Sequence, residues 1–219
     1  MIESPDHPAV TRIVAIRHGE TTWNAEQRLQ GQLDIPLNTL GERQAAQLAG
    51  TLRGEGLHRV IASDLGRAWQ TAQALAAPLG LPLEAEPGLR ERCFGVLQGH
   101  TYAEIDSRWP DLARRWRTRD VDFEPEGGES LRQFNARCLG TLDRLAARYP
   151  GQSLAVVCHG GVLDCFHRAA THVALDLPRT WALGNAAINR LLHTPQGLAL
   201  VGWNDDAHLD GLSLDESST

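Results

Sequence analysis

The chain has 219 residues, 42% of them hydrophobic, and a formal net charge of −6. Its length suits a single domain, its acidic balance argues against a general nucleic-acid binder, and no apolar run approaches the roughly 20 residues needed to span a bilayer. All 21 basic residues are arginine, which excludes Schiff-base catalysis and a lysine-bearing phosphate loop. Any anion must therefore be held by arginine, histidine or backbone N–H groups.

The cysteines are scattered and show no CxxC spacing; they are Cys93, Cys138, Cys158 and Cys165. This pattern predicts neither a zinc site nor a disulfide framework in a chain of this length. The polar, acidic N-terminus does not resemble a signal peptide. We therefore expect reduced thiols in a cytoplasmic protein that needs no metal and no cofactor and has no membrane or nucleic-acid partner.

The first half of the chain predicts strands that alternate with helices. Residues 1–11 are expected to be a frayed lead-in, 12–17 a buried strand, and 18–38 a long polar loop with a helical turn at most. Thr39 and Glu42 match a capping box that starts a helix with Ala45, Leu48, Ala49 and Leu52 on one face. A strand over 58–62 follows, then a helix capped by Ser63-Asp64, and a short strand over 82–85.

The second half predicts an insertion and then a return to alternation. Residues 92–128 are expected to form short helices over the site, with an arginine cluster at Arg114, Arg115, Arg117 and Arg119. Ser130 and Gln133 match a second capping box before a long amphipathic helix. A strand over 154–158, a helix over about 161–170, and a hairpin of 186–193 with 197–203 follow. The last 15 residues are expected to be a loose tail.

These elements predict an α/β fold, a three-layer α/β/α sandwich whose central sheet is mainly parallel. We expect one domain over 1–219, with the insertion at about 92–128. In such sheets, sites form beyond the carboxyl ends of the strands. His18-Gly19 and His159-Gly160 each follow a predicted strand, so the two histidines are expected to share one crevice.

Arginine, histidine and glutamate side chains gather at these predicted strand ends. Arg17 and His18 end one strand, His159 ends another, Arg67 lies just after a strand-to-helix turn, and Glu91 ends a further segment. A neutral imidazole can attack phosphorus while guanidinium groups clamp the phosphoryl oxygens. A carboxylic acid can protonate the leaving oxygen and then activate water. The set favours phosphoryl transfer through a covalent intermediate without a metal.

The same stretches carry a family resemblance. Arg17-His18-Gly19-Glu20-Thr21 with Trp23-Asn24, Ser63-Asp64-Leu65 with Arg67-Ala68 and Gln70-Thr71, Glu91-Arg92 with Gly95, and Cys158-His159-Gly160-Gly161 resemble the phosphoglycerate-mutase-like branch of the histidine phosphatase superfamily. The resemblance runs from about residue 12 to 204. It implies that His18 is the nucleophile, that Arg17, Arg67 and His159 form the phosphate pocket, and that Glu91 is the proton donor. It further implies phosphate or substrate contacts from Thr21, Asn24, Gln30, Gly31 and Gly160.

Some sequence features favour a phosphatase and others favour a mutase. The 28–38 loop and the 126–130 stretch look like those of broad phosphatases, and the lysine and longer insertion of the glycolytic mutases are missing. Arg114-Arg115, in contrast, resembles an arginine pair of the mutase insertion. A metal-independent phosphatase of small phosphorylated metabolites is favoured. A phosphoglycerate mutase that interconverts 3- and 2-phosphoglycerate remains an alternative.

A third interpretation is a catalytically silent phosphate-binding protein. Loss of a core residue would indicate such a protein, but the set is complete: Arg17, His18, Arg67, Glu91 and His159.

An exposed apolar strand edge could also pair two copies of the chain into a homodimer. The natural substrate is expected to be selected by residues 92–128.

Overall fold

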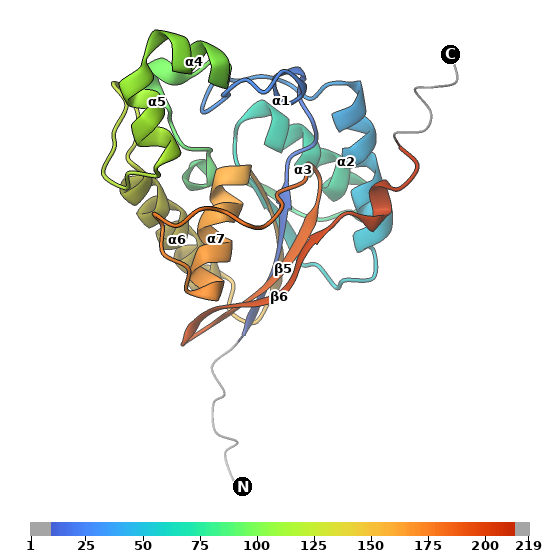
Figure 1. Ribbon diagram of the computed structural model, residues 1–219. Helices are drawn as coiled ribbons and strands as arrows, with labels where there is room; N and C mark the ends of the chain where they lie inside the picture. The colour runs from blue at the N-terminus through green and yellow to red at the C-terminus, as the bar shows by residue number, and fades with distance from the viewer. Residues whose placement is uncertain (1–9, 213–219) are drawn as a thin grey trace, which may run out of the picture.

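A computed structural model describes residues 10–212, in which a six-stranded sheet is covered by helices on both faces (Figure 1). The strand order is β3-β2-β4-β1-β5-β6. Strands β1 to β4 are mutually parallel, whereas β5 runs antiparallel to β1 and β6 antiparallel to β5. Their bounds are Thr11–Arg17 (β1), Arg59–Ala62 (β2), Leu83–Ala85 (β3), Ser153–Cys158 (β4), Ile188–Thr194 (β5) and Gly197–Asp205 (β6).

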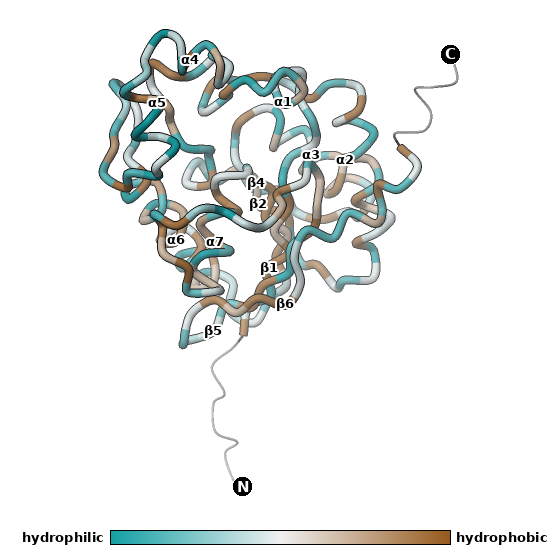
Figure 2. Tube along the Cα trace, in the orientation of Figure 1, coloured by the Kyte–Doolittle hydropathy of each residue, from teal (hydrophilic) through white to brown (hydrophobic). Residues whose placement is uncertain are grey.

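The central strands are apolar on both faces, as expected of parallel strands between two helical layers. β4 is buried along its whole length. Alternate residues of β1 belong to different cores: Ile13 packs with the cluster of α6 and α7, and Val14 with that of α2 and α3. Figure 2 shows the apolar colouring concentrated along these strands. The three-layer α/β/α sandwich predicted from the sequence is confirmed.

The long helices form the outer layers, and short helices lie near the carboxyl ends of the parallel strands (Figure 1). The long ones are α2 (Thr39–Leu52), α3 (Gly66–Leu79), α6 (Leu131–Arg148) and α7 (Gly160–Thr171). The short ones are α1 (Thr22–Ala25), α4 (Tyr102–Arg108) and α5 (Pro110–Arg117), with 3-10 turns η1 (Pro87–Leu89), η2 (Gly95–Leu97) and η3 (Ala207–Leu209).

Two of the predicted helix caps are wrong. The side chain of Asn38, not Thr39, caps α2 by accepting a hydrogen bond from the Gly41 amide at 2.8 Å. The predicted capping box would have used the Glu42 amide, which instead donates to the Asn38 backbone carbonyl at 3.0 Å. Helix α3 starts after Leu65 without a side-chain cap, and Ser63 and Asp64 have other partners.

The cap of α6 is confirmed. The Ser130 hydroxyl accepts from the Gln133 amide at 3.1 Å, and the Gln133 side chain accepts from the Ser130 amide at 2.7 Å. These reciprocal bonds form the capping box that the sequence predicted.

The ends of the described chain are more ordered than the sequence suggested. Thr11 belongs to β1 rather than to a lead-in, because it pairs with His193 and its hydroxyl donates to the Tyr149 carbonyl at 3.3 Å. The expected C-terminal tail begins within β6 and continues into η3. The rest of both predicted loose ends, residues 1–9 and 213–219, lies outside the described residues.

The predicted insertion contains η2, α4 and α5 and has a small core of its own, in which Leu97, Ile105 and Phe123 pack with Leu29. Arg92 anchors it: its guanidinium donates to the carbonyls of Glu129 and Phe123, both at 2.9 Å. All four cysteines are free thiols. None of the helices within residues 10–212 is long and apolar enough to cross a membrane.

Candidate active site

The register of β1 and β4 brings the two histidines together. The strands are adjacent and parallel, and Arg17 pairs with Cys158 at their carboxyl ends. The His18 amide continues the ladder by donating to the Cys158 carbonyl at 3.0 Å. As a result, the ring centroids of His18 and His159 lie 5.1 Å apart. The sequence correctly predicted that the two histidines lie side by side, although only His18 borders the cavity described below.

His18 is held in one tautomer by its own neighbour. Its Nδ1 lies 2.7 Å from the Gly19 carbonyl oxygen, which can only accept, so Nδ1 carries the hydrogen and Nε2 keeps its lone pair. The side chain is 3% exposed. Burial first, and then the charges of Arg67 and Arg17, hold the pKa of His18 well below its ordinary value of 6.5. At neutral pH the ring is therefore an uncharged base.

His159 is fully buried beside it, with Nε2 2.8 Å from the Ser63 hydroxyl. Burial and the charge of Arg67 lower the pKa of His159 well below its ordinary value as well. Its Nδ1 has no hydrogen-bond partner among the described residues. Ser63, predicted as a helix cap, thus fixes the orientation of the second histidine instead.

Arg17 and Arg67 are each anchored through the ends of their guanidinium groups. Arg17 Nη1 donates to the Leu183 carbonyl at 2.5 Å, and Arg67 donates to the carbonyls of Gly31 and Leu33 at 2.7 and 2.9 Å. The Nε atoms of both arginines are buried and have no partner within residues 10–212. Buried N–H donors normally have a hydrogen-bond partner. Because these two have none, they are suited to donate to a bound anion.

Burial lowers the pKa of Arg67 to about 10, against the opposing effect of Glu91, so this arginine remains charged at neutral pH. Burial also lowers the pKa of Arg17 from its ordinary value. Two positive charges thus lie beside the neutral His18 ring.

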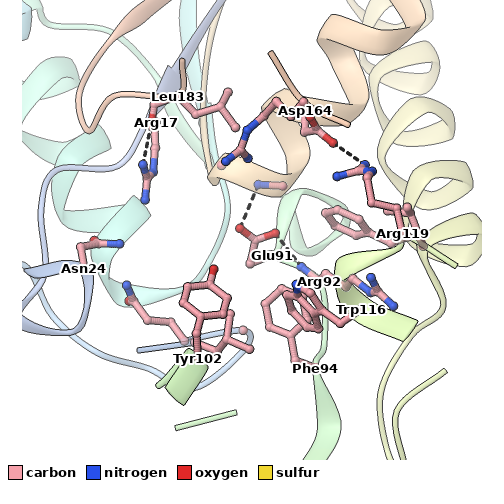
Figure 3. Close-up of a pocket in the computed structure, with 18 of the residues that line it drawn as sticks. Arg17, Asn24, Glu91, Arg92, Phe94, Tyr102, Trp116, Arg119, Asp164 and Leu183 are labelled. Atoms are coloured by element: carbon pink, nitrogen blue, oxygen red, sulfur yellow. Dashed lines mark hydrogen bonds and ion pairs between the residues drawn. The ribbon is translucent and has the colours of Figure 1, made fainter. Parts of the chain in front are cut away.

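Glu91 presents a carboxylate on the cavity wall (Figure 3), which Asp120 and Asp164 also border. One oxygen accepts from the Arg92 amide at 2.8 Å and the other from the Gly161 amide at 3.0 Å. Gly161 must be small, because a Cβ there would lie 2.2 Å from the Glu91 carboxylate. The first turn of α7 thus holds the acid in place.

These groups open onto a cavity of about 600 Å³. The sequence-predicted residues that border it are Arg17, His18, Asn24, Gln30, Gly31, Arg67, Glu91 and Gly160. Gln30 is nearly buried, and its Oε1 has no partner in the described chain, which makes it available to a ligand. His159 lies beside the cavity without bordering it.

Thr21 does not border the cavity either; its side chain lies in the cap of α1. The backbone amide of Asn24 donates to the Thr21 hydroxyl at 3.2 Å, and the side-chain Oδ1 of Asn24 accepts from the Thr21 backbone amide at 3.1 Å. The threonine expected to contact phosphate therefore positions Asn24, which does border the cavity.

The sequence placed the insertion over the site but named none of its residues as site residues, and it did not predict a contribution from the loop before β5. The insertion supplies Phe94, Tyr102, Trp116, Arg117 and Arg119, and the loop over residues 172–187 supplies Arg179 and Trp181. The length of that loop could have indicated its role, because long connections without secondary structure are commonly functional. Arg114 and Arg115 do not border the cavity; they pair with Asp111 and Asp120.

The fold agrees with the comparisons to known proteins. The model of the histidine phosphatase superfamily (branch 1) matches residues 13–206. The chain is 37% identical to phosphoglycerate mutase-like protein 4 of Arabidopsis thaliana over 90% of this chain and 86% of that one. It is 34% identical to a probable phosphoglycerate mutase of Cronobacter sakazakii, over 94% and 98% of the two chains.

Among solved structures, a mycobacterial glucosyl-3-phosphoglycerate phosphatase complexed with vanadate superposes with a TM-score of 0.78 at 33% identity. The match covers 89% of this chain and 98% of that one. The chain therefore belongs to the histidine phosphatase superfamily, as the resemblance of its motifs implied.

Proposed function

We propose that the chain is a phosphatase that hydrolyses small phosphate monoesters through a phosphohistidine intermediate on His18. The observation that carries the proposal is the hydrogen bond of His18 Nδ1 to the Gly19 carbonyl at 2.7 Å. It leaves Nε2 as a free lone pair on a ring that burial and two arginines keep neutral. An uncharged, oriented imidazole beside paired guanidinium groups is the arrangement that attack on phosphorus requires.

In the first step, His18 Nε2 forms a bond to phosphorus as the bond from phosphorus to the ester oxygen breaks. Arg17 and Arg67 hold the non-bridging oxygens through their unpartnered Nε groups and neutralise their charge. Glu91, as the acid, gives its proton to the departing oxygen, which leaves as an alcohol.

In the second step, Glu91, now a carboxylate, takes a proton from water as the water oxygen bonds to phosphorus and the bond to Nε2 breaks. Inorganic phosphate is released and His18 returns to its neutral form. His159, oriented by Ser63, lies beside the His18 ring, where it can donate to the transferring group once its Nδ1 carries a hydrogen.

Several observations favour water over a second substrate as the phosphoryl acceptor. The chain has no lysine for a phosphoglycerate carboxylate, and Arg114-Arg115, the pair that favoured a mutase, lies off the cavity wall. The similarity to the mycobacterial phosphatase points the same way. The names of the two curated relatives favour mutase activity instead, so mutase is the second candidate.

Rapid-quench labelling with a ³²P monoester tests the mechanism. We expect an acid-labile phosphoenzyme on His18 that forms and decays as phosphate is released, and loss of both signals in His18→Ala. Label on any other residue would contradict the intermediate. Interconversion of 3- and 2-phosphoglycerate that outpaces phosphate release, with or without a bisphosphoglycerate primer, would instead identify a mutase.

A further inference from the structure

The arginines that border the cavity differ in what they already bind. Arg28, Arg117 and Arg119 form ion pairs with Glu104, Asp106 and Asp164 respectively. Arg17, Arg67 and Arg92 donate to backbone carbonyl groups. Arg179 differs from all of them, because it makes no hydrogen bond or ion pair with any residue between 10 and 212.

The loop over residues 172–187 places Arg179 on the same side of the cavity as Arg17. Leu183, four residues further along this loop, accepts the hydrogen bond from Arg17 Nη1. Four residues of extended chain span at most about 14 Å, so the backbone of Arg179 cannot lie far from that contact. The positive charge of Arg179 also contributes to lowering the pKa of Arg17, after burial as the main cause.

The loop that carries Arg179 is fixed in place. Arg168 donates to the carbonyls of Ala174 and Leu177, and Arg119 donates to that of Leu175 at 2.7 Å. Trp181 stacks on His167 with ring centroids 3.9 Å apart. The guanidinium group of Arg179 is therefore presented from an anchored backbone, which lowers the entropic cost of binding a ligand there.

Tyr102 borders the same cavity as Arg179. Its hydroxyl makes no hydrogen bond with a described residue, and Figure 3 shows it pointing into the cavity between Asn24, Arg17 and Glu91. The charge of Arg179 acts on the Tyr102 phenol as well as on Arg17. A guanidinium group and a phenol are both hydrogen-bond donors that an acidic group can accept from.

We propose that Arg179 and Tyr102 form a second anion-binding subsite, so that the substrate is a phosphate monoester carrying another acidic group near the ester. Arg17 and Arg67 would bind the transferred phosphate. The other cavity arginines already donate to carboxylates or backbone carbonyls, so Arg179 is left for the second acidic group. The inference rests on the proposed phosphatase function for its chemistry. Carboxylate and phosphate share the acceptor chemistry that such a subsite recognises.

Matched pairs of esters test the subsite. 3-Phosphoglycerate differs from glycerol 3-phosphate only by a carboxylate in place of a hydroxymethyl group, and propane-1,3-diyl bisphosphate differs from 3-hydroxypropyl phosphate only by the second phosphate. Release of inorganic phosphate is measured for each, with p-nitrophenyl phosphate as a reference. We expect kcat/KM to favour the acidic member of at least one pair by about tenfold or more. The pair that shows the preference distinguishes carboxylate from phosphate.

Arg179→Gln should reduce this preference to within about twofold of unity, mainly by slowing the acidic ester. Tyr102→Phe should reduce it partially. Arg114→Gln is the matched control, because it removes the same charge from an exposed side chain that does not border the cavity. Equal rates for both members of both pairs, or an equal loss for all esters in Arg179→Gln, would overturn the subsite.

Binding separates this proposal from the proposed function. Calorimetric titration of the His18→Ala variant with 3-phosphoglycerate, glycerol 3-phosphate and the two propanediol esters does not depend on turnover. Tighter binding of an acidic member, lost in the His18→Ala/Arg179→Gln double variant, would support the subsite even if the wild-type protein hydrolysed nothing. Equal binding within both pairs would refute it even if hydrolysis were fast.

Discussion

The carboxylate of Glu91 accepts a hydrogen bond from the backbone amide of Gly161 at 3.0 Å, 70 residues away in sequence. This contact ties the segment after η1 to the first turn of α7, directly beyond His159. Together with the bond from the Arg92 amide, it leaves the carboxylate little rotational freedom. The proposed acid is therefore oriented by two main-chain amides, those of Arg92 and Gly161.

Glu91→Gln should slow hydrolysis according to the leaving group. An alkyl phosphate such as glycerol 3-phosphate needs a proton on its departing oxygen, so we expect its kcat to fall by about 100-fold or more. p-Nitrophenyl phosphate leaves as a stabilised anion and should lose about tenfold or less. Steady-state kinetics over a series of aryl and alkyl esters measures the difference. A uniform loss across the series would argue against the role of Glu91 as an acid.

Gly161→Ala should impair the same step without altering the acid itself. The new Cβ would meet the Glu91 carboxylate at 2.2 Å and the Phe134 ring at 3.0 Å, so one of them must move. We expect a fall in kcat of about tenfold or more for alkyl esters, with a smaller effect for p-nitrophenyl phosphate. Gly140→Ala, a helix position where the nearest atom lies at 3.9 Å, is the control and should retain full activity. Matching losses in both variants would show that the contact with Glu91 is unimportant.

Asp164→Asn should destabilise the fold. The buried Asp164 carboxylate accepts from Arg119 at 2.9 Å and from Arg168 at 3.0 Å, and joins the insertion to α7. Removing its charge leaves the buried Arg168 guanidinium uncompensated, which costs about 3–5 kcal/mol. Urea denaturation measures the free energy of unfolding. Asp111→Asn, which breaks an exposed pair with Arg114, should change that free energy by less than about 1 kcal/mol.

Stability should fall on mild acidification. His18 and His159 have folded pKa values well below the ordinary 6.5, so below about pH 6.5 the unfolded chain binds protons that the folded chain does not. The unfolding free energy should therefore drop as the pH falls from 6.5 toward the folded pKa values, by up to about 1.4 kcal/mol per pH unit for each histidine. Partly buried His167 and His208, whose pKa values are also lowered, add to the slope.

Urea titrations at several pH values, in buffers without phosphate, measure this slope. The His18→Asn/His159→Asn variant should show a shallower dependence over the same range, because its substituted side chains do not titrate. A wild-type curve that is flat between about pH 6.5 and 5.5, or a variant with the same slope, would contradict the shifted values.

Vanadate should inhibit by occupying the position of the transferring phosphoryl group between His18, Arg17 and Arg67. A chelator should leave activity unchanged, because the mechanism takes its positive charge from arginine. Inhibition constants for vanadate and rates before and after EDTA treatment check both expectations. Activity lost to the chelator and restored by an added divalent cation would require a different account of the site.

The sequence predicted the inner site well because strand ends constrain it. His18 and His159 each end a continuous apolar run, and two such runs in a parallel sheet must finish at the same edge. The proposed role of Glu91 as an acid rests on the motif that resembles the family's. Its hydrogen bond to Gly161, in contrast, depends on a tertiary approach that no local pattern specifies.

The caps and the outer wall were less predictable, for a physical reason. Asn38 and Thr39 are both good capping residues, but Asn38 is also held by tertiary contacts: its backbone amide donates to the Glu20 carbonyl at 3.0 Å and its side chain to the Glu20 carboxylate at 2.8 Å. Serine commonly caps helices, but the Ser63 hydroxyl forms a hydrogen bond with His159 Nε2 instead. Arg179 stands in a loop without periodicity, so only its place in space reveals that it borders the cavity.

The first strand of the chain lies inside the sheet, between β4 and β5. The backbone around its carboxyl end is held by residues of the loop before β5: the Ala186 amide donates to the Arg17 carbonyl at 3.0 Å, and the Asn185 side chain donates to the His18 carbonyl at 3.0 Å. During synthesis, His18 is made well before Asn185 and Ala186, so its backbone partners are missing until those residues follow. The setting of the proposed nucleophile is thus assembled only after residue 186 has been made, and a shorter nascent chain carries the motif without the site.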